Sequence, residues 1–381
     1  MKSPGAAMPR RSADSRVNLA SNELIHPDVT ALHRRMLEGL SWDELRTYPV
    51  LDRPVQAVAT LFGCDETEVS LAPGSDSGIR LLLRVTASRF KGRLLIQAPN
   101  YTAWWTAQEA QGWTIREVFS PDRTAEGSLA ALDAEIVTAK PSLVVMSWPN
   151  GPAGFTPDLS AVRAFATRCA MHGHLLVIDA CYAGFTADPR TVAQLAGDAC
   201  VVLLSWSKLF GLAGGRVAAL FSSPRLIDEV RALEAERQLS APTLHAVART
   251  GLVYREFARI WRALAAERER WNASLLELGW RTLPSGGNFI PMIAPDPDVA
   301  DRAEALASAS GYRIRNLSMV RGCGPLLRVS VACGPIADRA LHALHQALRG
   351  AIAYHGGPNS PGHRPAAGAS HNAGLIDGRT S

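Results

Sequence analysis

The residues best suited to chemistry lie in one stretch, Ser205-Trp206-Ser207-Lys208, which follows the apolar run Val201–Leu204. Arg216 comes eight residues after the lysine, behind a glycine-rich segment. An amine that attacks a carbonyl needs a lowered pKa, which partial burial beside cationic groups supplies. Serine hydroxyls and an arginine bind anions, and a phosphate fits that set of donors. The alternative from these residues alone is a surface lysine in a turn, because loops of this composition are common.

Other suggestive residues follow apolar runs or open helical patterns. Gly74-Ser75-Asp76-Ser77 begins a predicted helix, where free backbone N–H groups and the helix dipole favour a phosphate. Tyr101 follows a predicted strand, where an aromatic ring can stack on a planar ligand. Asp179 ends the run Leu175–Ile178, with Tyr182 three residues later, and a carboxylate there is costly without a cationic partner. Taken alone, residues 74–77 could just as well be an ordinary capped helix start, and Tyr101 could just as well be a core residue.

The elements that must position these residues alternate along the chain. Buried strands are predicted at 93–97, 142–146, 175–179 and 201–204, and helices at 79–85, 101–111 and 159–169. Near-continuous apolar strands between amphipathic helices indicate a mainly parallel sheet covered on both faces, so the predicted class is α/β, a three-layer αβα sandwich. Ligands bind at the carboxyl ends of the strands in such sheets, which is where Asp179, Lys208 and Arg216 fall.

The chain becomes helix-rich after Pro224, and a long helical pattern from Thr243 to Leu278 is expected to contain a break. An α+β unit follows, with strands expected at 287–294, 312–317 and 326–332 and helices at 300–309 and 336–348. We interpret this unit as a smaller C-terminal domain. The expected division is a disordered tail at 1–16, an arm at 17–45 that joins the small domain, a large domain at 46–272, the small domain at 273–352 and a disordered tail at 353–381.

Composition and charge narrow the possible functions. The net charge of the 381 residues is +5, and most of the excess lies in residues 1–16, so the basic pI is no argument for a nucleic-acid partner. No apolar segment reaches the roughly 18 residues of a membrane span, and no secretory signal is evident. The six cysteines form no CxxC pair or metal-binding cluster, which favours reduced thiols and a cytoplasmic location.

The order and spacing of these motifs resemble the fold-type I aminotransferases, which use pyridoxal 5'-phosphate. The branch it most resembles contains the histidinol-phosphate aminotransferases and the threonine-phosphate decarboxylases. The resemblance runs from about Asn18 to Leu348, and its most specific part is S-x-S-K followed by G-x-x-G-x-R at 205–216. Residues 179–182 are similar to the family's D-E-A-Y motif, and residues 74–78 to its phosphate-binding G-A-D-E-G motif. This cofactor needs a Schiff-base lysine, an acid at the pyridinium nitrogen, a phosphate cup and a platform for its ring.

The resemblance implies a role for each matching residue. Lys208 is the Schiff-base lysine and proton shuttle, Asp179 pairs with the pyridinium nitrogen, and Tyr101 stacks on the ring. Tyr182 bonds the ring hydroxyl. The implied phosphate contacts are Ser75, Asp76, Ser205, Ser207 and Arg216, joined by Tyr48 from a partner subunit. The implied substrate contacts are Arg328 for an α-carboxylate, Arg315 for a substrate phosphate, and Asn22. The family is expected to act as a homodimer on a small amino substrate and a keto acid.

The sequence departs from the family pattern at two places. Residues 149–154 read P-N-G-P-A-G, where the family has P-N-N-P-T-G and its second asparagine bonds the ring hydroxyl. Gly151 has no side chain for that bond, so either Asn150 replaces it through a shifted loop or the contact is absent. Asn22-Glu23-Leu24 replaces the usual N-E-N-P run, which predicts a different lip on the substrate side.

Three functions remain open from the sequence. The main hypothesis is a pyridoxal-phosphate-dependent aminotransferase that acts on an amino acid or an amino-acid-derived substrate. The second keeps the cofactor but breaks another bond, giving a decarboxylase, lyase, cyclase or oxidase of specialised amino-acid metabolism, and the departure at Gly151 supports it. The third is a non-enzymatic regulator that binds an amino acid, but the sequence has no added DNA-binding domain to support it.

Overall fold

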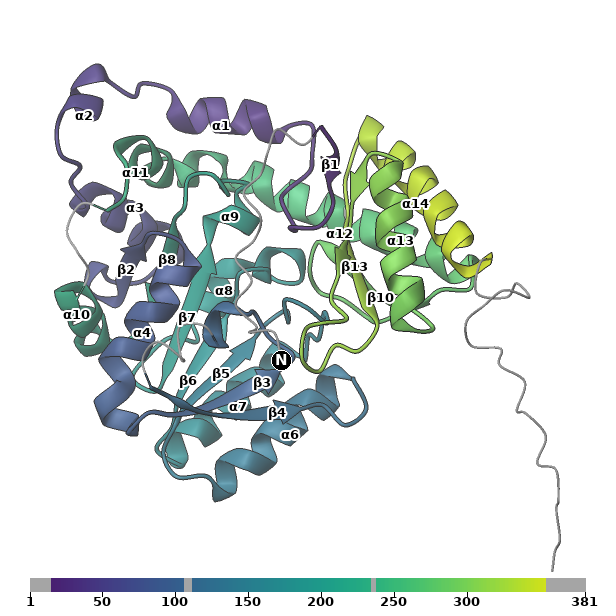
Figure 1. The fold of residues 1–381 in the computed structure, drawn as a ribbon. Helices are drawn as coiled ribbons and strands as arrows, with labels where there is room; N and C mark the ends of the chain where they lie inside the picture. Colours follow the sequence, from purple (N-terminus) through teal and green to yellow (C-terminus); the bar gives the residue numbers. More distant parts are fainter. Residues whose placement is uncertain (1–14, 106–111, 234–237, 354–381) are drawn as a thin grey trace, which may run out of the picture.

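The computed structural model describes residues 15–105, 112–233 and 238–353. Its largest feature is a seven-stranded sheet with helices on both faces, and beside it lies a smaller unit with a four-stranded sheet (Figure 1). The expected α/β class with three layers is confirmed. Most of the two expected tails and residues 106–111 of the helix expected at 101–111 lie outside the described residues.

The central sheet is mainly parallel, as expected. Its strand order is β2-β8-β7-β6-β5-β3-β4, and in this described sheet only β8 runs antiparallel to its neighbours. The bounds of its strands are β2 (Val69–Ala72), β3 (Arg93–Ala98), β4 (Thr114–Phe119), β5 (Leu143–Ser147), β6 (Leu175–Asp179), β7 (Cys200–Ser205) and β8 (Ala218–Phe221). Because β3, β5, β6 and β7 are parallel, their carboxyl ends meet at one edge of the sheet.

Alternate side chains of each strand pack into two different cores. In β5, Leu143 and Val145 belong to one core, whereas Val144 and Met146 belong to the other. Burial on both faces is the reason that these strands are continuous apolar runs in the sequence. The first face is covered by α4 (Ser75–Phe90) and α10 (Pro224–Leu233), and the second by α3 (Asp52–Phe62), α6 (Ala125–Thr138), α7 (Leu159–Met171) and α8 (Pro189–Ala193).

The long helical pattern at 243–278 contains the expected break. It divides into α11 (Ala241–Ala248), the 3₁₀ turn η3 (Thr250–Val253) and α12 (Tyr254–Glu277). The other helical elements are α1 (Val29–Leu37), α2 (Trp42–Arg46), η1 (Glu66–Glu68), η2 (Ala183–Phe185) and α9 (Trp206–Leu209). Helix α12 runs from the large sheet to the smaller unit and crosses the boundary expected at 272 (Figure 1).

The smaller unit is built on a sheet of order β12-β13-β10-β9, packed against α13 (Pro297–Ala309) and α14 (Pro335–Ala353). Its strands are β9 (Arg281–Thr282), β10 (Phe289–Ile293), β12 (Arg315–Asn316) and β13 (Leu326–Ser330). The N-terminal arm lies against this unit, because β1 (Val17–Asn18) pairs with β11 (Tyr312–Arg313) and Ile25 bridges to Ala332. The domain boundaries themselves stay a prediction.

The sequence patterns missed β2, β4 and α6. Strand β4 lies at the sheet edge, where exposed residues interrupt its apolar pattern, and α6 is rich in alanine, which weakens its apolar stripe. The single strand expected at 312–317 is wrong. That run divides into β11 and β12, which belong to different sheets, with the buried Ile314 between them.

The cysteines are free thiols throughout the chain. Burial raises the pKa of the Cys200 thiol to about 12 and is the main cause that raises the pKa of Cys64 to about 11. Both thiols therefore stay protonated at neutral pH and are poor nucleophiles. Within the described ranges, no helix has the length and apolar character needed to cross a membrane.

We expect Phe165→Ala to lower the free energy of unfolding by about 3–5 kcal/mol, because it removes a buried aromatic ring from α7. Met171→Ala, at the end of the same helix, is the matched control and should change it by less than about 0.5 kcal/mol, since Met171 is 78% exposed. Urea unfolding followed by tryptophan fluorescence measures both. Equal destabilisation by the two variants would contradict the assignment of α7 to the core layer.

Candidate active site

The candidate site lies at the carboxyl edge of the central sheet. Strand β6 ends at Asp179, and β7 pairs with it in parallel, so that Lys208 follows the end of the neighbouring strand. Helix α4 begins at the same edge with Ser75. The N-terminal arm near Asn22 and the small-unit strand β13 near Arg328 close over these residues. The fold therefore brings together the residues that the sequence placed at separate strand ends.

Lys208 is held in the short helix α9 directly after β7. Ser205 caps this helix, because its Oγ accepts a hydrogen bond from the Ser207 amide at 3.3 Å. The Nζ of Lys208 donates to the carbonyl oxygen of Ser21 at 2.6 Å. Burial, followed by the positive charge of Arg328, lowers the pKa of Lys208 to about 8. A neutral amine is therefore accessible near physiological pH, as a carbonyl nucleophile requires.

An anion cradle lies at the start of α4. Gly74 has a positive φ of 80°, which favours glycine, and a Cβ there would lie 2.7 Å from Nη2 of Arg216, so a larger residue would displace the guanidinium from its present position. Arg216 pairs with Asp76 at 3.3 Å. The Oγ of Ser207 is buried and has no hydrogen-bond partner within the described residues. A free buried hydroxyl, an arginine and the N-terminal amides of a 16-residue helix fit a phosphate group.

Asp179 is buried at the end of β6. Burial raises the pKa of its carboxyl group, and the amide of Cys181, which donates to Oδ1 at 3.4 Å, acts in the opposite direction. In the described part of the chain, no cationic side chain forms an ion pair with this carboxylate. A buried acid of this kind is stabilised in its charged form by a protonated ring nitrogen, which fits the pyridine ring of the implied cofactor.

The two predicted tyrosines differ in their surroundings. Tyr101 is 40% exposed, and its hydroxyl donates to Oδ1 of Asp76 at 2.9 Å, which ties its ring to the anion cradle. Tyr182 accepts a hydrogen bond from Nδ2 of Asn22 at 2.9 Å. Its ring packs edge-on against Phe289, with centroids 5.3 Å apart. Burial raises the pKa of the Tyr182 hydroxyl, so it is a neutral donor at physiological pH.

Arg328 brings a buried positive charge to the site. Its Nη1 donates to the Gly151 carbonyl at 2.8 Å and its Nη2 to the Ala20 carbonyl at 3.1 Å, while its Nε is buried with no partner in the described residues. Its guanidinium lies 5.3 Å from the ring centre of Phe289. Arg315 is its cross-strand neighbour in β12. A buried guanidinium that contacts carbonyls, an aromatic face and no carboxylate is suited to an anionic ligand.

Asn150 points away from the expected cofactor position. Its Nδ2 donates to Oε1 of Gln97 at 3.0 Å and to the Pro99 carbonyl at 2.8 Å, and its Oδ1 accepts from the Ala153 amide. Both donor hydrogens are thus used by acceptors in and directly after β3, and the geometry does not favour Asn150 as a replacement for the missing asparagine side chain. A Cβ at Gly151 would lie 3.5 Å from Cε2 of Tyr182, an ordinary contact, so the site has room for a side chain there.

Tyr48 is the predicted aromatic residue with the greatest exposure. It lies between α2 and α3 and is 75% exposed. Trp42, at the start of α2, is 86% exposed, and Val50, in the same connecting segment as Tyr48, is 68% exposed. Large exposed apolar side chains in one segment are typical of an interaction surface.

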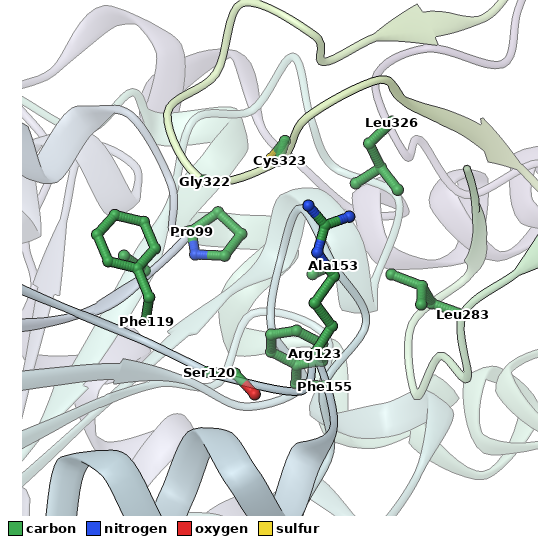
Figure 2. Close-up of a pocket in the computed structure, with 11 residues that line it drawn as sticks. Pro99, Phe119, Ser120, Arg123, Ala153, Phe155, Leu283, Gly322, Cys323 and Leu326 are labelled. Carbon is green, nitrogen blue, oxygen red and sulfur yellow. The ribbon is translucent and has the colours of Figure 1, made fainter. Parts of the chain in front are cut away.

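Several residues of the site were missed by the sequence analysis. Ser21, Asn288, Phe289 and Ser330 contact the predicted residues, but they come from parts of the chain far apart in sequence and match no short motif. A pocket beside the site was also missed. Figure 2 shows Arg123 in this pocket, between the end of the central sheet and a loop of the smaller unit. Its other labelled lining residues are Pro99, Phe119, Ser120, Ala153, Phe155, Leu283, Gly322, Cys323 and Leu326.

Comparison with known proteins gives a consistent result. The profile of the family described as "Aminotransferase class I and II" matches residues 14–344. A histidinol-phosphate aminotransferase of Stenotrophomonas maltophilia is 31% identical over 300 residues, covering 76% of this chain and 80% of that protein. One from Mycolicibacterium smegmatis is 29% identical over 290 residues, covering 72% and 74%.

Solved structures with the same fold were also found. Histidinol-phosphate aminotransferase from Sinorhizobium meliloti, in complex with pyridoxal-5'-phosphate, has a TM-score of 0.73 at 21% identity and covers 89% of this chain and 91% of that chain. L-threonine-O-3-phosphate decarboxylase from Porphyromonas gingivalis has a TM-score of 0.73 at 18% identity, covering 87% and 99%. At these identities the structural likeness establishes the fold.

The lowered pKa of Lys208 predicts how the cofactor-free protein reacts with a small aldehyde. Reductive methylation with formaldehyde and cyanoborohydride should modify Lys208 at a rate that rises about tenfold per pH unit and levels off near pH 8, where the neutral amine predominates. Peptide mass spectrometry measures the rate, with an N-acetyl-lysine amide standard that levels off about two units higher. Arg328→Leu should move the Lys208 profile to higher pH. A profile that coincides with the standard would contradict the lowered pKa.

Proposed function

Because this chain belongs to the class I and II aminotransferase family, whose members are pyridoxal-phosphate-dependent enzymes, we propose that Lys208 is the lysine that binds the cofactor covalently. The observation that carries this proposal is the buried Lys208 amine beside the anion cradle of Arg216 and Ser207. Pyridoxal phosphate supplies an electron-withdrawing ring that stabilises negative charge on the substrate Cα. The remaining roles belong to side chains of this protein.

The geometry supports a set of proposed cofactor contacts. Ser75, Ser205, Ser207 and Arg216 hold the phosphate at the start of α4. Asp76, expected from the sequence to join them, pairs with Arg216 and accepts a hydrogen bond from Tyr101, so it positions these two residues. Asp179 binds the protonated ring nitrogen. Tyr101 stacks on the ring, and Tyr182 donates to the ring hydroxyl oxygen. Asn150 supports the loop at 149–154 through its bonds to Gln97 and Pro99.

Lys208 also moves the proton. When it is not bonded to the cofactor, the Nζ of Lys208 would be free to take a proton from the substrate Cα and to hold that proton for transfer. A general base works best when its pKa is near the operating pH, and a pKa of about 8 meets that condition.

Arg328 binds an anionic group of the amino substrate, and Arg315 binds a second one. The α-carboxylate of an amino acid fits the fork of Arg328. The curated relatives named histidinol-phosphate aminotransferase support an amino-acid-derived substrate with a phosphate as the other class. If the substrate of this class lacks a carboxylate, its phosphate is its anionic group, and one of the two arginines binds it. Asn22 lines this side of the site.

The second candidate function uses the same cofactor for another reaction, namely that of a decarboxylase, lyase, cyclase or oxidase. The absent side chain at Gly151 favours it, because that position otherwise adjusts the charge of the ring oxygen. Incubation with an amino donor and a keto acid separates the two. Conversion of the bound cofactor to its amino form, with a new amino acid, supports transamination. Release of CO₂ or ammonia without amino transfer supports the alternative, and a protein that takes up no pyridoxal phosphate contradicts both.

We further propose that the protein acts as a homodimer in the cytoplasm. The free cysteines suit a reducing compartment. Tyr48 lies on the exposed segment that carries Trp42 and Val50, and it reaches the phosphate of the partner subunit. An isologous interface would place two such sites in each dimer. No nucleic acid or membrane takes part in this proposal.

Arg328→Ala is expected to raise the KM for the amino substrate at least about thirtyfold, because a desolvated anion contact is worth about 2–5 kcal/mol. The absorption spectrum of the bound cofactor should stay unchanged. Arg339→Ala, an exposed arginine in α14 of the same unit, is the matched control and should leave KM unaltered. If KM and kcat of Arg328→Ala both remain at the wild-type values, Arg328 does not hold the substrate.

Subunit complementation tests the role of Tyr48. Tyr48→Phe should weaken cofactor binding roughly ten- to hundredfold, the worth of one hydrogen bond to a charged group. In mixed dimers of Tyr48→Phe and Lys208→Ala chains, one site receives its lysine and its tyrosine from unmutated positions, so that site should bind cofactor with wild-type affinity. If Tyr48 instead contacted the phosphate in its own subunit, the site with the intact Lys208 would carry Tyr48→Phe. Cofactor binding at that site would then stay as weak as in the Tyr48→Phe dimer.

A further inference from the structure

Asn22 is the most constrained residue at the lip of the site. Its side chain is fully buried, and its φ of 53° is in the left-handed region that asparagine tolerates better than most residues. Its backbone amide donates to Oγ of Ser330 at 2.9 Å, and its carbonyl oxygen accepts from Nδ2 of Asn288 at 3.3 Å. The backbone is thus fixed by the small unit on both sides, which leaves the side-chain amide for another purpose.

The hydrogen bonds of Ser330 decide which way this amide points. Ser330 Oγ accepts from the Asn22 backbone, and its own hydrogen is donated to Oδ1 of Asn22 at 3.0 Å. Oδ1 is therefore the acceptor end, and Nδ2 is the end that faces Tyr182, at 2.9 Å from its hydroxyl oxygen. In the reverse orientation Asn22 would no longer accept the hydroxyl hydrogen of Ser330, which would then need another acceptor.

The contact determines the direction of the Tyr182 hydroxyl hydrogen. Because the oxygen accepts from Asn22, the hydrogen must be donated elsewhere, and it has no acceptor in the part of the chain that the structure describes. The ring itself is held by the edge-on contact with Phe289, 5.3 Å between centroids. With the ring fixed and one lone pair occupied, the hydroxyl hydrogen of Tyr182 is left to point away from Asn22.

We propose that Asn22 is a positioning residue that directs the Tyr182 hydroxyl hydrogen at the ring hydroxyl oxygen of the cofactor, and that it thereby compensates for the side chain absent at Gly151. The inference rests on the proposed cofactor role of Tyr182. It assigns to Asn22 a role through Tyr182 in place of the direct substrate contact expected from the sequence. It also explains why a buried, left-handed asparagine lies in the arm although the residues after it depart from the family pattern.

Asn22→Gly removes the side chain and keeps the positive φ and both backbone hydrogen bonds. Asn18→Gly is the matched control, because Asn18 lies in the same arm and its side-chain Oδ1 accepts hydrogen bonds from Ala20 and Ser21 of that arm. The readout is the pH at which the absorption of the bound cofactor changes, which reports the proton on the Schiff-base nitrogen. A donor to the ring oxygen draws negative charge away from that proton, so losing the donor raises the transition pH.

We expect Asn22→Gly to raise the transition by about half to one pH unit, the effect of one hydrogen bond, and Asn18→Gly to leave it unchanged. In a Tyr182→Phe background, Asn22→Gly should have no further effect, since there is no hydroxyl left to direct. Gly151→Asn should restore the transition in Asn22→Gly, because the new amide supplies the missing donor and the site has room for its Cβ.

Two outcomes would overturn the inference. One is an Asn22→Gly transition that matches wild type, and the other is an effect of Asn22→Gly that persists unchanged in Tyr182→Phe. Either would leave Asn22 as a purely structural link between the arm and the small unit. The proposed function has its own test, which is the cofactor absorption of the wild-type protein. It fails if that absorption is missing, or if it is unchanged in Lys208→Ala. Melting temperatures of the variants, with cofactor bound, verify that each is folded.

Discussion

Positive charge that is largely withdrawn from solvent is the constraint on which the site depends. Lys208 and Arg328 are both half-buried, and in the described chain their hydrogen bonds go to the carbonyl oxygens of Ser21, Ala20 and Gly151 and to no carboxylate. Carbonyl dipoles offset only part of the cost of burying a charge. Lys208 reduces the cost by losing its proton readily, whereas Arg328 cannot, so the arginine gains most from an anionic ligand.

The fold creates this interior from distant parts of the chain. Parallel strands deliver Asp179 and Lys208 to one edge, and the start of α4 adds the anion cradle there. The lid over these residues is the N-terminal arm, which is held by the small unit through β1 and β11. Because the arm supplies carbonyls to both buried cations, its docking on the small unit and the electrostatics of the site depend on each other.

The sequence predicted those parts that are encoded locally. Asp179 and Lys208 could be found because each follows an apolar strand directly, and the parallel sheet follows from such strands alternating with helices. The edge strand β4 and helix α6 gave weak patterns and were missed. The contacts of Asn22 with Tyr182 and with Ser330 join residues 160 and 308 positions apart, and no periodicity or motif reports a pairing of that range. The role proposed for the outward-facing Tyr48 depends on a second chain.

The departure at Gly151 has structural consequences on two sides. Its carbonyl oxygen is the acceptor for Arg328 at 2.8 Å, so the loop acts on the substrate arginine through its backbone. Gly151 has no side chain that could bond the ring oxygen. Asn150 does not provide this bond either, because Gln97 and Pro99 use both of its donor hydrogens. On the proposed assignment, control of the ring oxygen passes to Tyr182, whose hydroxyl is directed from the arm by Asn22. The single change to glycine would then move a cofactor contact from a loop of the large sheet to a segment that is held by the small unit. Any displacement of the small unit would then change the cofactor's hydrogen bonding and the position of the substrate anion at the same time.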